Sequence, residues 1–260
     1  MSTANVHQRE RDFYNHFWIE KRASLVEGTL VPIPGIETLA GKRVLICSCG
    51  SGVEAVLAAK AGAEVCMFDI SDTAVENTLR VAALNHVNVS AEVMSFEELR
   101  YDDNVFDVMY GSSILHHVDC ARVATEIYRC LKPGGVAYFL ENSARNPLVR
   151  VARRLVFGTP GKNQRQRFLF FTRHGTADEY PLTDAEVAEF DTAFSGNVQL
   201  VFDEFVFFQL LHAFCLRREW FRSLTLRLDE LVVALFPGLM KYSYDRHVWM
   251  QKPKDLAGRL

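Results

Sequence analysis

The chain has 260 residues, of which 49% are hydrophobic and 23% charged, and its formal net charge is −3. These proportions are ordinary for a globular protein, and the length suits one large or two small domains. The chain has neither an overall basic balance nor a basic appendage, so we do not expect it to bind nucleic acid. Its longest apolar stretch, residues 205–216, contains Gln209 and His212 and is too short to cross a bilayer.

Six cysteines fall mostly within predicted strands and helices, and no two have Cys-x-x-Cys spacing: Cys47, Cys49, Cys66, Cys120, Cys130 and Cys215. We therefore expect neither a zinc site nor a redox motif, but small buried side chains in a reducing compartment. Residues 1–11 are polar and charged, with no apolar segment behind them of the kind found in secretory leaders. These features together predict a cytoplasmic location.

The predicted elements begin with an amphipathic helix over residues 7–25, followed by a break at Pro32–Gly35. Short apolar runs then alternate with helical patterns from residue 42 to residue 142. Five of these runs read as strands: residues 44–47, 63–68, 87–94, 104–110 and 136–141. This alternation predicts an α/β fold, a Rossmann-like, doubly wound and mostly parallel sheet with helices on both faces.

The second half of the chain is less regular. Residues 143–180 show no clean period. The sequence from Thr183 to Glu186 is a capping box, which predicts a helix that begins there and continues through Phe194. We expect a sixth strand over residues 198–208 and a seventh over residues 242–250, with a helical insertion between them at residues 209–241.

The first strand, turn and helix carry the clearest functional signal. The run Val44–Cys47 leads into a small-residue turn that contains Gly50 and Gly52, and Asp69 ends the next strand. A glycine lets the backbone turn sharply and approach a ligand, and a carboxylate at the second strand's end can accept hydrogen bonds from both ribose hydroxyls. The pattern predicts a site for an adenosine-containing cofactor.

Further motifs follow in one order across residues 42–142. They are Phe106-Asp107-Val108, Leu115-His116-His117-Val118 and Leu131-Lys132-Pro133-Gly134-Gly135. Together with the glycine turn, they resemble the class I S-adenosylmethionine-dependent methyltransferases, in the small-molecule branch. The chain departs from that family's pattern at Ile46, where an acid is usual, at Ser48, which replaces the first glycine, and at Ser95, where an acid is again frequent.

The resemblance implies transfer of a methyl group from S-adenosylmethionine to a small molecule, leaving S-adenosylhomocysteine. It leaves open whether the acceptor atom is oxygen, nitrogen or carbon. It also implies a seven-stranded sheet whose last strand is antiparallel. The expected organisation is an N-terminal helical segment, residues 1–41, and a methyltransferase domain, residues 42–260, which includes a substrate or cap segment at residues 143–182.

The resemblance assigns the cofactor to residues of four loops: Ser48, Cys49, Gly50, Gly52, Asp69, Ile70, Ser95, Phe96 and Ser112. The catalytic candidates are His117, His116 and Glu141, which follow the fourth and fifth strands, where open α/β sheets bind ligands. A histidine there can take a proton from the acceptor, because its ordinary pKa lies near neutrality. Packing and capping roles for the two histidines remain equally open.

Two further aromatic residues, Tyr14 and Trp18, either close over the cofactor or anchor the first helix. Metal-using quinone-pathway O-methyltransferases resemble the segment around the histidines, but they carry glutamates where Ser113 and His116 stand. We therefore expect no metal site here.

Charge is distributed unevenly after residue 142. Residues 142–177 hold no acid but eight basic residues: Arg145, Arg150, Arg153, Arg154, Lys162, Arg165, Arg167 and Arg173. Either this tract is a solvated face that the acids after it compensate, or it faces an anion. The insertion is apolar enough to pack on the core or on a second copy, or to form a lid that contacts a greasy substrate or a membrane surface. The combined hypothesis is an acceptor with an apolar body and an anionic group.

Two other functions remain as alternatives. A non-catalytic cofactor-binding or assembly protein with a degenerate methyltransferase fold would explain the departures at Ile46, Ser48 and Ser95. A nicotinamide-dependent oxidoreductase would use a similar strand-turn-helix unit. The identity of the acceptor, the use of a general base and the oligomeric state, including a homo-oligomer, stay open.

Overall fold

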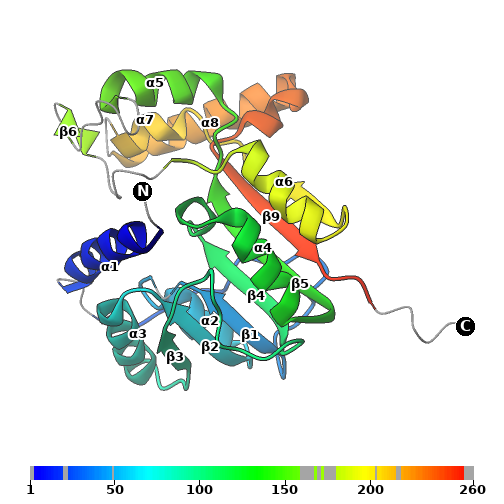
Figure 1. Cartoon of the computed structure of the whole chain (residues 1–260). Coiled ribbons are helices and arrows are strands. Elements are labelled where there is room, and N and C mark those ends of the chain that lie inside the picture. The colour runs from blue at the N-terminus through cyan, green and yellow to red at the C-terminus, as the bar shows by residue number, and fades with distance from the viewer. Residues whose placement is uncertain are drawn as a thin grey trace, which may run out of the picture.

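The computed structural model describes residues 3–19, 23–48, 50–158, 167–168, 171–172, 180–202, 204–214 and 218–254. Its centre is a seven-stranded sheet in the order β3-β2-β1-β4-β5-β9-β8 (Figure 1). The strands are β1 (Arg43–Cys47), β2 (Glu64–Asp69), β3 (Ser90–Val93), β4 (Phe106–Ser112), β5 (Leu131–Asn142), β8 (Val198–Val201) and β9 (Asp245–Gln251). The first five are parallel, while β9 runs antiparallel to both of its neighbours, β5 and β8. The predicted sheet is confirmed.

Helices cover both faces of the sheet. They are α2 (Val53–Lys60), α3 (Asp72–Leu84), α4 (Cys120–Cys130) and α6 (Asp184–Ala193), with a 3-10 turn η1 (Leu115–His117) after β4. Within β1, Leu45 and Cys47 pack in a core with α4 and α6, while Val44 and Ile46 pack in a second core with α2 and α3. Burial on both faces explains why the parallel strands β1, β2 and β4 read as apolar runs.

Helix α6 begins with the predicted capping box. The Thr183 hydroxyl accepts the amide of Glu186, and the Glu186 carboxylate accepts the amide of Thr183. These bonds satisfy amides that have no partner inside the helix. The predicted helix is confirmed, with Phe194 as its C-terminal cap.

The first helix, α1 (Thr3–Ile19), lies against α3, and the Asn77 side chain donates to the carbonyl of Trp18 at 2.7 Å. The helix begins and ends earlier than the predicted residues 7–25: it starts at Thr3, and residues 23–27 are not helical. The Asn85 side chain accepts the amide of Val26 and donates to the carbonyl of Ser24, so these two backbone groups are not available to a helix.

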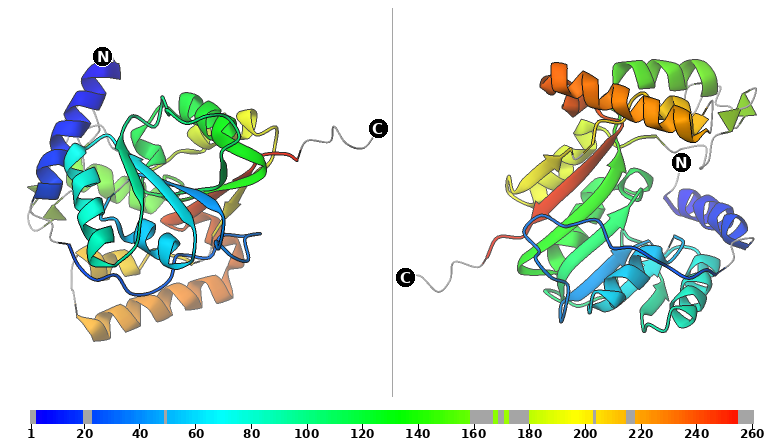
Figure 2. Two further views of the ribbon diagram at one scale, coloured as in Figure 1. Left: turned by 90° about the horizontal axis from the view of Figure 1, so that it is seen from below. Right: turned by 180° about the vertical axis from the view of Figure 1, so that it is seen from behind.

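A group of helices that we call the cap consists of α5 (Pro147–Phe157), α7 (Gln209–Phe214), α8 (Glu219–Leu235) and the 3-10 turn η2 (Pro237–Tyr242). Figures 1 and 2 show these elements side by side, beyond the end of the sheet where β5 stops and β9 starts. Between α5 and α6 the chain also forms two short antiparallel strands, β6 (Arg167–Phe168) and β7 (Phe171–Thr172). The helical insertion between the last two strands is confirmed. In the described residues no helix is long and apolar enough to cross a membrane.

The predicted sixth strand was too long. Residues 198–208 were expected in it, but β8 ends at Val201. The buried carboxylate of Asp229 in α8 accepts the amides of Phe207, Phe208 and Gln209 at 3.3, 2.8 and 3.1 Å. These bonds start α7, so the same amides cannot enter a sheet ladder.

Candidate functional site

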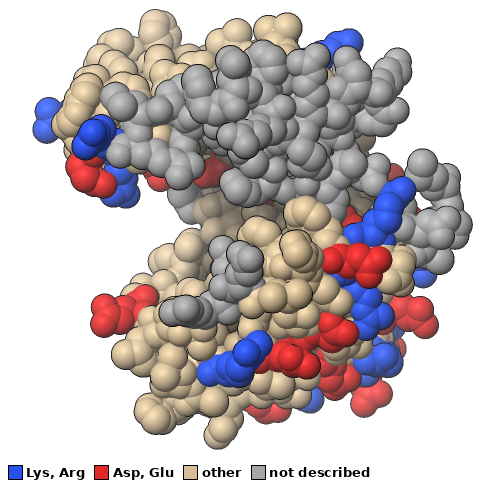
Figure 3. All heavy atoms as spheres, turned by 90° about the vertical axis from the view of Figure 1, so that its left-hand side faces the viewer, with Lys and Arg blue, Asp and Glu red and all other residues tan. Residues whose placement is uncertain are grey.

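A cavity of about 250 Å³ lies at the carboxyl ends of β1, β2 and β4 and is closed on one side by α1. The chain leaves β1 toward β2 on one side, whereas β4 lies on the other, and this reversal of strand order is where open α/β sheets bind ligands. Figure 3 shows the side of the molecule that carries α1, with the surface hollowed between the cap above and the rest of the molecule below. The cavity is lined by His7, Glu10, Tyr14, Trp18, Ser48, Gly50, Phe68, Asp69, Ile70, Met94, Ser95, Phe96, Ser112, Ser113, Ile114, His117 and Val118.

Asp69 is fixed at the wall formed by β2. The residue is 7% exposed, its Oδ1 accepts the amide of Ser71 at 2.8 Å, and its Oδ2 accepts the Ser48 hydroxyl at 3.2 Å. Ser71 in turn caps α3 through the amide of Ala74. The carboxylate is therefore oriented by groups of two neighbouring loops before any ligand binds.

The turn after β1 brings backbone to the same wall. Gly50 has a φ of +48°, a conformation that favours glycine, and a Cβ built on it would have no atom within 4 Å. The backbone at Gly50 is thus open to the cavity that it lines. Ser48 adopts the left-handed region as well, with a φ of 79°.

The structure brings most of the predicted cofactor residues together. Seven of them line the cavity: Ser48, Gly50, Asp69, Ile70, Ser95, Phe96 and Ser112. Gly52 does not line it, since this residue caps the N-terminus of α2 and lies close to Thr78 of α3. Cys49 lies outside the described residues.

His117 is the one predicted catalytic candidate that lines the cavity. Its Nδ1 lies 3.2 Å from Oε1 of Glu10, and its Nε2 lies 3.3 Å from the hydroxyl of Tyr14. The side chain is only 6% exposed. A carboxylate, an imidazole and a phenol thus form a hydrogen-bonded chain between α1 and η1.

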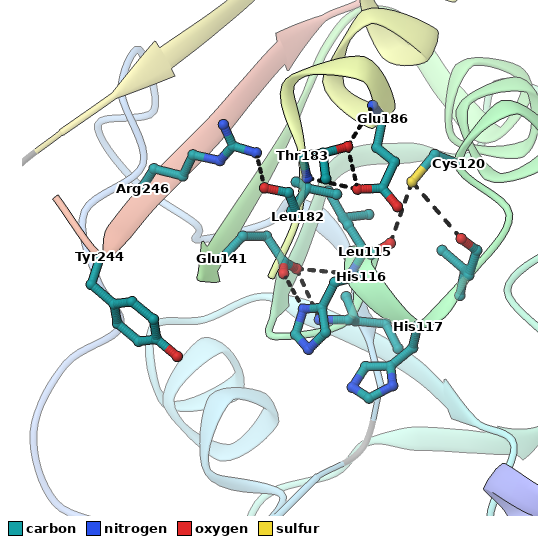
Figure 4. Close-up of polar contacts among 12 residues, drawn as sticks. Leu115, His116, His117, Cys120, Glu141, Leu182, Thr183, Glu186, Tyr244 and Arg246 are labelled. Atoms are coloured by element: carbon teal, nitrogen blue, oxygen red, sulfur yellow. Dashed lines mark hydrogen bonds and ion pairs between the residues drawn. The ribbon is translucent and has the colours of Figure 1, made fainter. Parts of the chain in front are cut away.

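The other two candidates, His116 and Glu141, do not line the cavity. Both are buried, and His116 Nδ1 lies 2.7 Å from Glu141 Oε2 (Figure 4). The second oxygen of Glu141 accepts the amides of Ile114 and Leu115, each at 2.8 Å. Glu141 therefore holds the turn that carries His117, and it holds it through backbone as well as through His116.

Sequence reasoning missed two polar residues of this site, His7 and Glu10. Along with Tyr14 and Trp18, they stand three or four residues apart on α1 and all line the cavity. That spacing places side chains on one face of a helix, and it is the signal that would have found them. His7 is further held by Glu97, whose carboxylate lies 3.3 Å from His7 Nε2.

Among the described residues, no group of three or more His, Cys, Asp or Glu side chains is arranged to hold a metal ion. The chemistry of the cavity is instead set by one oriented carboxylate, an open backbone turn, apolar walls and the chain from Glu10 to Tyr14.

Residues 45–139 match the family described as a methyltransferase domain. The chain contains a class I S-adenosylmethionine-dependent methyltransferase domain. It is 36% identical, over 122 residues, to a ubiquinone biosynthesis O-methyltransferase of Thiobacillus denitrificans; the match covers 44% of this chain and 50% of that protein. The chain thus spans about half the length of this curated relative.

Solved structures share the fold of the methyltransferase domain. A Haemonchus contortus phosphoethanolamine N-methyltransferase 2, in complex with phosphomonomethylethanolamine and S-adenosylhomocysteine, aligns with a TM-score of 0.58 and 19% identity, over 85% of this chain and 50% of that one. The [4+2]-cyclase SpnF aligns with a TM-score of 0.54 and 14% identity, over 96% of both chains. At these identities the likeness concerns the fold alone. These comparisons give no support to a non-catalytic assembly protein.

The residues present fit the cofactor of the methyltransferase domain. Asp69 is a buried, oriented acceptor at the end of β2, and Phe96 and Met94 supply apolar surface in the same cavity. Gly50 leaves the backbone accessible at the turn. An acceptor for hydroxyls, an apolar wall and an open turn are what an adenosine requires.

Proposed function

We propose that this protein transfers a methyl group from S-adenosylmethionine to a small-molecule acceptor. The observation that carries the proposal is a single cavity that joins Asp69 and the turn at Gly50 to His117 and its partner Glu10. When bound, the cofactor supplies a methyl group already made electrophilic by the sulfonium. The protein then has to hold the acceptor in line with that methyl group, and positioning of this kind can lower a barrier by about 7–11 kcal/mol.

The nucleoside would be held by the residues at the ends of β1 and β2. Asp69 would accept from the ribose hydroxyls, while Ser95 and Phe96 would lie against the adenine. Ser112, at the end of β4, would face the amino-acid portion of S-adenosylmethionine. These assignments rest on the position of each residue in the cavity wall.

His117 would take the proton of an acceptor that has to lose one. The Glu10 carboxylate faces Nδ1 and favours the tautomer with its hydrogen there, which leaves Nε2 as the acceptor. The Tyr14 hydroxyl lies at that nitrogen, so the acceptor's proton can reach Nε2 directly or through the phenol. The proposal covers oxygen, nitrogen and carbon acceptors.

The acceptor would combine an apolar body with an anionic group. The support comes from the cap, where exposed basic residues such as Arg150 and Arg154 stand beside exposed apolar ones such as Leu148 and Leu155. The predicted basic tract beyond residue 158 lies almost wholly outside the described residues. A cytoplasmic location, a lack of nucleic-acid partners and the oligomeric state stay predictions.

Calorimetric titration with S-adenosylhomocysteine tests the cofactor site. We expect micromolar binding to the parent protein and at least about tenfold weaker binding to Asp69→Ala, because two ribose hydrogen bonds to a carboxylate are lost. Asp72→Ala is the matched control, since that carboxylate is exposed at the start of α3. No binding to the parent would overturn the proposed function, and equal binding to Asp69→Ala would remove Asp69 from it.

Methyl transfer to a panel of apolar acids and phenols tests the role of His117. We expect His117→Asn to lose about 10²–10⁴-fold in rate with an acceptor that must be deprotonated, while its affinity for S-adenosylhomocysteine is retained. His86→Asn, at an exposed histidine after α3, is the matched control. Parent-like rates in His117→Asn would exclude it as the base.

A further inference from the structure

Two more cavities lie next to each other in the cap. The first, which we call the basic cavity, has a volume of about 440 Å³, and the residues that give it its character are Arg145, Arg150, Lys241, Asp184 and Tyr242. None of its described lining residues belongs to the wall of the cofactor cavity. The basic cavity is therefore a separate candidate binding site.

Asp184 supplies the single carboxylate among the described residues that line the basic cavity, and this carboxylate is already paired. Asp184 accepts from Arg145 Nε at 2.8 Å and from Arg246 Nη1 at 2.7 Å. Arg246 is fully buried behind it. The negative charge of Asp184 is thus matched by two guanidinium groups.

Arg150 and Lys241 provide further positive charge. Neither forms an ion pair with a carboxylate of any residue that the structure describes, and Lys241 Nζ lies 5.3 Å from the centre of the Tyr242 ring. Two cations that have no carboxylate partner among the described residues, in the wall of one cavity, attract an anion, because a phosphate or carboxylate can contact both.

The second cavity, which we call the apolar cavity, has a volume of about 320 Å³ and lies between the start of α5, the segment that precedes α7, α8 and η2. Its wall is formed mainly by Leu148, Phe205, Phe207, Phe208, Val232 and Leu239. Tyr242 lines this cavity as well as the basic one. The Asn146 side chain, which caps α5, donates to the carbonyl of Tyr242 at 2.9 Å and fixes the boundary between the two.

We propose that the basic and apolar cavities together bind one amphiphile, a molecule with a phosphate or carboxylate head and a hydrocarbon tail. The head would contact Arg150 and Lys241, and the tail would lie among Phe207, Val232 and Leu239. Burying the tail stabilises the complex by about 25 cal/mol for each Å² removed from water, and the cations select the anionic head. The binding of this amphiphile goes beyond the proposed function and is independent of it, because no described residue lines both the cofactor cavity and either of these two cavities.

Calorimetric titration with decyl phosphate, below its micellar concentration and without cofactor, tests the site. We expect the parent to bind decyl phosphate, and to bind ethyl phosphate or decanol at least about tenfold more weakly, because each lacks one half of the ligand. Equal affinity for decyl phosphate and decanol would overturn the assignment of the basic cavity. Binding to vesicles of phosphatidylglycerol but not to monomeric decyl phosphate would overturn the proposal in favour of a membrane surface.

Matched variants locate the ligand in the cap. The double variant Arg150→Gln/Lys241→Gln should bind decyl phosphate about tenfold or more weakly, whereas Arg222→Gln, at an exposed arginine of α8, should bind like the parent. Leu239→Glu places a negative charge, which repels the anionic ligand, in the apolar cavity and should also weaken the binding of decyl phosphate. Leu235→Glu, at a residue that is 63% exposed and lies outside the cavity, should not weaken it. Parent-like binding in both test variants would refute the site.

The outcome is separable from the proposed function. If decyl phosphate binds and S-adenosylhomocysteine does not, the cap site stands and the methyltransferase function fails. If S-adenosylhomocysteine binds and decyl phosphate does not, the methyltransferase function stands and the proposed site in the cap fails.

Discussion

Glu141 holds the turn that carries His117, and its removal should destabilise the whole domain. Glu141 is 3% exposed, and its carboxylate accepts from the amides of Ile114 and Leu115 and from His116. In Glu141→Ala the buried amide of Leu115 and the imidazole of His116 lose their acceptor, whereas Ile114 is only partly buried and water can replace part of its bond. Each lost bond to a charged group costs about 1.5–3 kcal/mol, so we expect a total of about 3–5 kcal/mol.

Urea unfolding followed by circular dichroism measures this cost. Glu141→Gln keeps one oxygen for the two amides and should lose only about 1–2 kcal/mol, mainly at His116. Glu64→Ala, at a carboxylate 70% exposed on the first residue of β2, should change the free energy of unfolding by less than about 0.5 kcal/mol. If Glu141→Ala fell within 1 kcal/mol of the parent at an unchanged urea dependence, the structural role of Glu141 would be refuted.

Three further predictions concern the core and the charges. Gly111→Ala should cost about 1–3 kcal/mol in urea unfolding, because the added Cβ would lie 2.7 Å from the buried ring of Phe139; a neutral effect would contradict the packing. Burial raises the pKa of Asp184, but hydrogen bonds from Arg246 and Arg145 outweigh it and lower that pKa. The ionised Asp184 therefore stabilises the fold fully at pH values above its unfolded pKa, near 4, and this stabilisation is lost as the pH falls through the folded pKa. The difference in the free energy of unfolding between the parent and Asp184→Asn should accordingly shrink in acid. A difference that stays constant with pH would contradict this. Burial raises the pKa of Cys130 to about 11, so mapping by mass spectrometry should find its alkylation at pH 8 to be about a hundredfold slower in the native than in the unfolded protein.

The sheet could be predicted from the sequence because its signals are local. Four of the five parallel strands, β1, β2, β4 and β5, contain runs that are buried on both faces and read as apolar in the sequence. The capping box at Thr183 marks a helix start through hydrogen bonds between residues three apart. The end of β8 could not be predicted in this way. It depends on Asp229, which lies more than twenty residues later and takes three amides out of the reach of the sheet.

In the candidate site, too, the residues whose position depends on local sequence could be predicted, and those whose position depends on tertiary packing could not. The residues after β1, β2 and β4 follow from the order of the strands, because parallel strands bring their carboxyl ends to one edge. Glu10 and His7 come from a helix that precedes the sheet, and their approach to His117 and Glu97 depends on how α1 packs against the rest of the molecule. Which of His116 and His117 faces the cavity also depends on tertiary structure. The two are adjacent in sequence, and His116 turns into the core because it contacts Glu141, whereas His117 lines the cavity.

The departures from the family's pattern in the first turn have a structural account. Ile46 is 2% exposed and packs with Val44 against α2 and α3, where a carboxylate would be buried in an apolar core. Ser48 adopts a left-handed conformation that is costly for a residue with a side chain, yet its hydroxyl donates to Asp69. The serine thus adds a donor to the carboxylate that would accept the ribose, and it aids in orienting that group. A turn that supports its acid in this way is compatible with cofactor binding, and the titration of Asp69→Ala with S-adenosylhomocysteine measures whether the compensation is sufficient.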